Sequence, residues 1–132
     1  MLLEIDHHSG VPIYRQVIRQ IRQQILTDSL QQGHQLETVR DLAARLHVNP
    51  MTISKAYSFL EAEGLVQRKR GIGLFVSKVN TDQLEQIKAQ LLDTIFSKAA
   101  ITAHQLGLSE EQAIDVLKTQ YHQYNSRHRR PT

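Results

Sequence analysis

The sequence contains no cysteine and no tryptophan, and its aromatic residues are limited to four Tyr and three Phe. The absence of cysteine excludes a disulfide scaffold, a thiol nucleophile and any thiolate metal site. Because aromatic residues are scarce, a core must be built mainly from Leu, Ile, Val and Ala. No run of about 18 apolar residues occurs, so no membrane-spanning helix is predicted. No basic-then-apolar leader is visible either, and we expect a soluble cytoplasmic protein.

The chain has 132 residues, a length that suits one domain or a small domain with an appendage. Its positive charge is unevenly distributed. Residues 1–80 contain ten Lys or Arg and seven Asp or Glu, a difference of +3, whereas residues 81–132 contain six of each. The excess peaks at Arg68-Lys69-Arg70, and Arg127-His128-Arg129-Arg130 forms a second basic cluster. Phosphate groups are therefore candidate partners, with a solvated surface as the alternative.

The first 30 residues predict one amphipathic helix. Leu2-Leu3-Glu4-Ile5 is short and apolar, which is compatible with an edge strand or an ordered arm. Pro12 suits the first position of a helix, where its missing N–H costs nothing. From Ile13 to Leu26 apolar residues recur at intervals of three and four, which predicts one buried stripe with Arg and Gln residues on the other faces.

Two shorter helices are predicted next. Thr38 is a good N-cap for the first of them, which ends near His47-Val48. Asn49-Pro50 predicts the start of the second helix, because Asn favours the N-cap position and Pro favours the first turn. Gly64 is placed to end it. Two short helices joined by so tight a turn predict a helix-turn-helix.

A β-hairpin follows the helices. Leu65-Val66 and Leu74-Phe75-Val76 favour β-structure, and the segment between them is basic and contains two glycines. Two strands around such a tip predict a hairpin that projects positive charge outward. The fold class is therefore mainly α with a small β-hairpin, in the order of a winged helix-turn-helix.

The remaining residues predict an α-hairpin. Asn80-Thr81-Asp82 indicates a hinge and a cap opening a helix of about 25 residues that ends at Gly107. Ser109-Glu110-Glu111-Gln112 is a capping box for a last helix. About 45 residues are too few to bury an apolar stripe alone, so we expect a second copy to cover it. The expected dimer interface consists of Leu84, Ile87, Leu91, Ile95, Leu117 and Tyr121. We expect a winged-helix domain at 1–79, a dimerisation region at 80–126 and a basic tail at 127–132.

Four runs of residues carry a resemblance to a known family. They are Leu42-Ala43, Val48-Asn49-Pro50-Met51-Thr52-Ile53-Ser54-Lys55-Ala56-Tyr57, Leu60-Glu61-Ala62-Glu63-Gly64-Leu65-Val66 and Gly71-Ile72-Gly73-Leu74-Phe75-Val76. Over about residues 10–78 the sequence resembles the DNA-binding domain of the GntR family of bacterial transcription regulators. The short C-terminal part resembles the YtrA subfamily in size and arrangement. The chain departs from the family pattern at Glu37, an acid where DNA passes nearby, and at Gln32, where the family tends to have proline.

The resemblance implies that the third helix reads bases in the major groove and that the wing enters the minor groove. The residues expected to contact DNA are Thr38, Arg40, Asn49, Met51, Thr52, Ser54, Lys55, Arg68, Lys69, Arg70, Gly71 and Gly73. Asn and Ser side chains can pair with base edges, and Met51 can touch a thymine methyl group. Alternatives stay open at four positions: Asn49 as a plain cap, Arg40 in an ion pair with Asp41 or Glu37, and Thr52 and Ser54 on a solvated helix face. Tyr57 is expected in the core.

The sequence therefore predicts a sequence-specific DNA-binding transcription regulator, a homodimeric repressor of an inverted-repeat operator. A winged-helix protein-interaction adaptor is the alternative, supported by Glu37 and the lack of arginine in the recognition turn. A nucleoid-type binder without sequence preference is a third. An enzyme is not expected, because no Gly-x-Ser-x-Gly, Gly-Lys-Ser/Thr or dinucleotide-binding motif occurs. The seven His are scattered, so no metal or cofactor is predicted. An unidentified small-molecule effector stays open as a partner.

Overall fold

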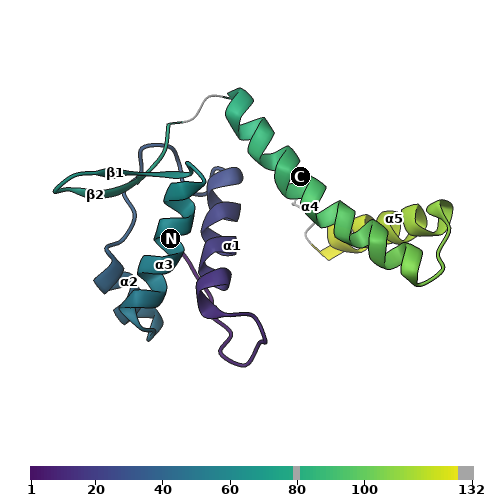
Figure 1. Cartoon of the computed structure of the whole chain (residues 1–132), viewed down its shortest axis with the longest axis horizontal. Helices are drawn as coiled ribbons and strands as arrows, with labels where there is room; N and C mark the ends of the chain where they lie inside the picture. The colour runs from purple at the N-terminus through teal and green to yellow at the C-terminus, as the bar shows by residue number, and fades with distance from the viewer. Residues whose placement is uncertain (79–80, 128–132) are drawn as a thin grey trace. The chain divides into compact units, whose positions relative to one another are not determined.

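The computed structural model of the chain describes residues 1–78 and 81–127 (Figure 1). The chain divides into two compact units, Met1–Glu85 and Gln86–Thr132. The expected domain boundary at residues 79–80 lies outside the described residues, as do residues 128–132 of the expected basic tail. The expected three-part division stays a prediction.

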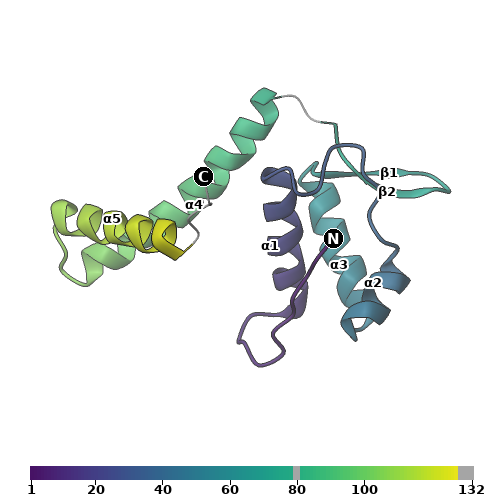
Figure 2. The same cartoon turned by 180° about the vertical axis from the view of Figure 1, so that it is seen from behind.

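The first unit has the predicted order of a winged helix-turn-helix. Its elements are α1 (Ile13–Leu26), α2 (Val39–Leu46), α3 (Pro50–Ala62), β1 (Val66–Lys69) and β2 (Gly73–Val76). The two strands are antiparallel, with Val66 opposite Val76 and Lys69 opposite Gly73. Figures 1 and 2 show the hairpin extending away from the three helices. This confirms the mainly α fold class with a small hairpin.

The core of this unit is aliphatic, as the composition predicts. α3 packs against both α1 and α2, and its inner face carries Ile53 and Leu60, which are seven residues apart. The largest fully buried side chains are Val17, Ile21, Leu42, Ile53, Leu60, Leu65, Val66 and Val76. Burial of such side chains contributes about 1.5–3 kcal/mol each, so this set holds the three helices and the wing together.

The segment before α2 pairs with β2, which the sequence did not predict. The N–H of Gly33 donates to the Val76 carbonyl at 2.8 Å, and the N–H of Val76 donates to the His34 carbonyl at 2.8 Å. The N–H of Leu36 donates to the Leu74 carbonyl at 2.9 Å. These bonds satisfy the outer edge of β2, so the base of the wing is joined to the chain that leads into α2.

The helix ends follow the predicted caps. The Thr38 hydroxyl accepts the N–H of the third residue of α2 at 3.1 Å, and the Asn49 side chain accepts an N–H of α3 at 2.9 Å. Gly64 follows α3 with a φ of +80°, the left-handed conformation that suits glycine. Ser109 and Gln112 exchange two hydrogen bonds at 2.8 and 3.2 Å, as in a capping box.

An extended arm at residues 2–6 lies along α1 and is not part of a sheet. Gln16 of α1 is buried, unlike the outward-facing glutamines that the helical pattern predicts. Its amide accepts the Asp6 N–H and donates to the Asp6 carbonyl, both at 2.9 Å. Gln20 and Gln24, each one turn further along α1, also bond to the main chain of the arm. Gln16 can be buried because main-chain groups of the arm satisfy the hydrogen-bonding capacity of its amide.

Two helices form the C-terminal part, α4 (Thr81–Gln105) and α5 (Glu110–Arg127). Gly107 lies between them with a φ of +81°, which confirms the predicted turn. Within the described residues neither helix contains a buried side chain. Neither they nor the other described helices are long and apolar enough to span a membrane.

Candidate nucleic-acid interface

The start of α2 is fixed by a tyrosine of α3. Tyr57 is 2% exposed, which confirms its expected place in the core, and its hydroxyl donates to the Glu37 carbonyl at 2.8 Å. Burial, and secondly the nearby Glu37 carboxylate, raises the pKa of Tyr57, so the hydroxyl stays protonated and can donate. The bond places Thr38 at the edge of α3. Because the Thr38 oxygen accepts the cap bond, its own proton remains to donate to a phosphate oxygen.

The acid that departs from the family pattern is paired. The Glu37 carboxylate accepts two hydrogen bonds from Arg45, at 2.7 and 3.2 Å. Arg45 also donates to the Met1 carbonyl at 2.9 Å, which ties the N-terminal arm to α2. A bidentate guanidinium offsets the carboxylate charge, so Glu37 presents much less negative charge to a nearby polyanion than an unpaired acid would.

The outward face of α3 carries several of the expected reading residues. Met51, Ser54 and Lys55 are exposed, Met51 at 78%, and Thr52 is half-buried. No acidic residue occurs from Pro50 to Leu60. Asn49 is the N-cap, so the cap interpretation is confirmed, and its amide nitrogen remains able to donate to a base or phosphate.

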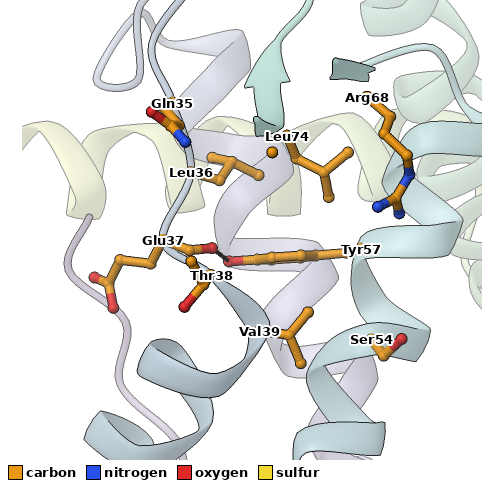
Figure 3. A pocket seen from close by; sticks show the side chains of 10 residues that line it. Gln35, Leu36, Glu37, Thr38, Val39, Ser54, Tyr57, Arg68 and Leu74 are labelled. Carbon is orange, nitrogen blue, oxygen red and sulfur yellow. Dashed lines mark hydrogen bonds between the residues drawn. The ribbon is translucent and has the colours of Figure 1, made fainter. Parts of the chain in front are cut away.

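A shallow cavity brings together four of the expected contact residues. Its volume is about 180 Å³, and its lining includes Thr38, the N-cap of α2, with Ser54 of α3, Arg68 of β1 and Gly73 of β2. Figure 3 shows the Tyr57 ring crossing this cavity, with Arg68 on one side and the Glu37 carbonyl at its hydroxyl end. Two hydroxyl donors and one guanidinium in a single depression are suited to oxygen atoms of a phosphate.

The three basic residues of the wing have different surroundings. The Arg68 Nε lies 3.5 Å from a carboxylate oxygen of Glu61, and the Lys69 ammonium lies 4.4 Å from the centroid of the Phe75 ring. For Arg70, which is exposed, the described residues show neither an ion pair nor a ring contact. The sequence pattern predicted one uniform basic tip, whereas the structure leaves Arg70 as the cation at its end.

The tip of the wing is a tight turn held by an amide. The Ile72 N–H donates to the Lys69 carbonyl at 2.9 Å, and Gly71, the third residue of this turn, has a φ of +77°. The Gln35 side chain donates to the Ile72 carbonyl at 3.2 Å. Gly73 has a φ of +145°, a conformation that other residues rarely adopt, and a Cβ there would lie 2.9 Å from the Gln35 amide nitrogen and displace that side chain.

Sequence reasoning missed an aromatic and basic cluster where α1 meets α3. The rings of Tyr14 and Phe59 stack with centroids 5.8 Å apart, and the Lys55 ammonium lies 4.0 Å from the Tyr14 centroid. Arg15 donates to the Tyr14 hydroxyl at 3.2 Å. This bond, with the charges of Arg15 and Lys55, lowers the pKa of Tyr14. The one signal in the sequence was the place of Phe59 off the buried face of α3, where an aromatic ring can stack on a neighbouring helix.

Arg40 is exposed on α2, and the described residues form no ion pair with it, because Glu37 pairs with Arg45 instead. The alternative of an Arg40–Asp41 or Arg40–Glu37 pair is therefore absent. Within residues 1–78 and 81–127, no three His, Asp or Glu side chains are grouped in a way that could hold a metal ion. The chemistry of this surface is thus that of hydroxyls, amides and guanidinium groups.

Comparison with known proteins agrees with this geometry. Residues 13–76 match the family model described as bacterial regulatory proteins, gntR family. Over 117 residues the chain is 33% identical to the HTH-type transcriptional repressor YtrA of Bacillus subtilis (strain 168), covering 89% of this chain and 90% of that protein. The chain belongs to the gntR family. Members with this domain are DNA-binding transcription regulators, and its relatives are regulators rather than enzymes.

Solved structures extend the gntR likeness to the fold. A GntR family transcriptional regulator from Listeria monocytogenes has a TM-score of 0.75 and 30% identity, covering 87% of this chain and 98% of that one. The structure of AraR(DBD) in complex with operator ORX1 has a TM-score of 0.52 and 28% identity, covering 57% of this chain and 96% of that one. At 87% coverage, the first of these likenesses extends beyond the winged helix into the C-terminal part.

Proposed function

We propose that this gntR-family chain is a homodimeric repressor, without enzymatic activity, that acts on DNA in the cytoplasm. In the proposal α3 enters the major groove of each half of an inverted-repeat operator, and the wing contacts the adjacent minor groove. The observation that carries it is the convergence of Thr38, Ser54 and Arg68 on one cavity beside the acid-free outer face of α3. The operator complex of the AraR domain supports a DNA partner for the same fold.

The division of labour among the contact residues follows from their surroundings. Thr38 and Arg40 at the start of α2, with Arg68, lie where phosphate oxygens would be held. Met51 faces outward from the first turn of α3, where helix-turn-helix proteins present side chains to base edges, whereas Ser54 belongs to the cavity that would hold a phosphate. Arg70, with Gly71 and Gly73, forms the tip that would reach the minor groove. The remaining proposed DNA contacts are Asn49, Thr52, Lys55 and Lys69.

The C-terminal helices supply the proposed dimer interface. Leu84, Ile87 and Leu91 are half-buried in the single chain. The large apolar residues that remain exposed on α4, α5 and the turn between them are Leu92, Ile95, Phe96, Ile101, Leu106, Ile114, Val116, Leu117, Tyr121 and Tyr124. Helices with this much exposed apolar surface and no buried residue need a partner. A second copy related by a two-fold axis is the commonest arrangement, and it doubles the DNA sequence that is read.

The DNA proposal is tested by selecting bound duplexes from a random pool at moderate salt and sequencing them. We expect an enriched inverted repeat. On that repeat, the double variant Arg40→Ala with Arg70→Ala should lose retention, and the salt slope should fall by about 0.9 for each phosphate that is no longer neutralised. Lys98→Ala with Lys118→Ala removes the same charge from α4 and α5 and serves as control. Equal affinity of the wild type for any duplex would contradict specific reading and indicate a nucleoid-type binder.

The dimer is tested separately by sedimentation. Ile95→Glu with Leu117→Glu places charges on the exposed apolar faces of α4 and α5 and should give a monomer with weakened operator binding. Leu2→Glu changes a side chain that is 87% exposed in the first unit and should stay dimeric. A wild type that sediments as a monomer, or a double variant that remains a dimer, would contradict this interface.

The alternative function, a protein-interaction adaptor, loses its main support, because the Glu37 carboxylate is paired with Arg45.

A further inference from the structure

We propose that Ile72 is an apolar wedge that enters the minor groove at the tip of the wing and partly unstacks one base step beside each half-site. The inference rests on the proposed operator binding and goes beyond it by naming a specificity-determining residue. The first observation is exposure. Ile72 is 65% exposed although it is apolar, and it sits in the turn that ends the hairpin.

The neighbours of Ile72 allow it to penetrate a narrow groove. Gly71 and Gly73 flank it, so no adjacent side chain holds the backbone away from the groove floor. A Cβ on Gly71 would meet open space, which shows that the tip is uncrowded on that side. Ile72 is thus the one side chain between two bare backbone positions, and it forms a narrow apolar projection.

The wing also holds this projection in place. The Gln35 amide donates to the Ile72 carbonyl, and the Ile72 N–H closes the turn on the Lys69 carbonyl. Gln35 belongs to the segment that pairs with β2, and its neighbour Leu36 bonds to Leu74. The wedge is therefore ordered before DNA arrives, which reduces the entropic cost of insertion.

The charge distribution favours a wedge over a purely ionic tip. Arg68 is directed to Glu61 and Lys69 to the Phe75 ring, so Arg70 is the tip cation among the described residues. Minor-groove proteins use side chains such as Arg to read the groove and insert apolar side chains between base steps, and the wing tip offers one residue of each kind. Pyrimidine–purine steps such as TA and CA/TG unstack at the lowest cost, so we expect one of them at the wing contact.

The test uses the full chain and the duplex that the wild type selects. A 2-aminopurine base, whose fluorescence rises when it is unstacked, replaces adenine at successive positions under the expected wing contact. Wild type and Ile72→Leu should raise the fluorescence at one step. Ile72→Ala should remove this rise and weaken binding about tenfold, equivalent to about 1.4 kcal/mol. Its salt slope should be unchanged because no cation is removed, unlike that of Arg70→Ala.

The controls separate the wedge from folding and from the proposed function. Leu2→Ala truncates another exposed apolar residue away from the wing and should behave as wild type. Ile72→Ala should melt at the wild-type temperature, because the side chain is exposed. If Ile72→Ala keeps the fluorescence rise and binds within twofold of wild type, the wedge is refuted while operator binding stands. If the wild type selects no site, both the operator proposal and the wedge are overturned.

Discussion

Replacing Glu61 by glutamine should strengthen DNA binding. Glu61 lies on α3, and its carboxylate is 3.5 Å from the Nε of Arg68 on β1. Both side chains are substantially exposed, at 37% and 59%. Such a surface pair contributes about 0.2–1 kcal/mol, so its removal should change the free energy of unfolding only slightly. Glu61→Gln removes the competing anion and leaves the Arg68 guanidinium for a phosphate.

The expected size of this effect follows from counterion release. In the wild type the exposed Arg68 guanidinium is shared between Glu61 and the proposed phosphate, so the variant gains at most one full phosphate contact, which steepens the log–log salt dependence by up to about 0.9. Between 50 mM and 200 mM salt, a fourfold change, the affinity of Glu61→Gln should therefore fall by up to about 3.5-fold more than that of wild type. At low salt the variant should bind more tightly than wild type, because the extra contact is then screened least.

The assay is fluorescence anisotropy of a labelled operator duplex over a series of salt concentrations. Glu63→Gln is the matched control, because Glu63 ends the same helix and pairs with Arg22 of α1, away from the wing. It makes the same change in charge and should leave the salt slope as in wild type. Equal slope changes in both variants would show a general charge effect, and no change in Glu61→Gln would refute competition between Glu61 and a phosphate for Arg68.

Two further predictions concern stability. Tyr57→Phe leaves the Glu37 carbonyl without its donor and should lower the free energy of unfolding in urea by about 1 kcal/mol, whereas Tyr121→Phe, at an exposed tyrosine, should not. Burial raises the pKa of Tyr57 above its ordinary value of 10.0, so the Tyr57 contribution to the free energy of unfolding is complete below pH 10 and is lost as the pH rises further. Tyr57→Phe should therefore reduce the loss of stability at alkaline pH. Gln16→Ala should speed hydrogen exchange at the Asp6 amide; unchanged exchange would contradict a docked arm.

Local features of this protein were predictable from the sequence. Thr38 and Asn49 were identified as caps, because a capping side chain bonds to an N–H only two or three residues away. The inner face of α3 was likewise predictable, since residues such as Ile53 and Leu60 repeat at helical spacing. The candidate contact residues came from the family resemblance, and their role on DNA stays a prediction.

Long-range pairs were not predictable in this way. Nothing in the spacing of Arg68 and Glu61, or of Lys55 and Tyr14, indicates that they meet, because each pair joins separate elements. The three basic residues of the wing therefore looked equivalent in the sequence. Gln16 has the pattern of a surface residue for the same reason, since the Asp6 main chain that it bonds lies ten residues earlier; its amide also donates to the nearer Val11 carbonyl.

The places where the helices and the hairpin begin and end follow from the sequence alone, because caps, turns and apolar periodicity act within a few residues. Which charges remain available to DNA depends on the tertiary structure. Folding pairs Glu37 with Arg45 and Arg68 with Glu61, and it leaves Arg70 at the tip of the wing. The physical reason is that an ion pair depends on the distance between two charged groups, and the packing of separate elements sets that distance.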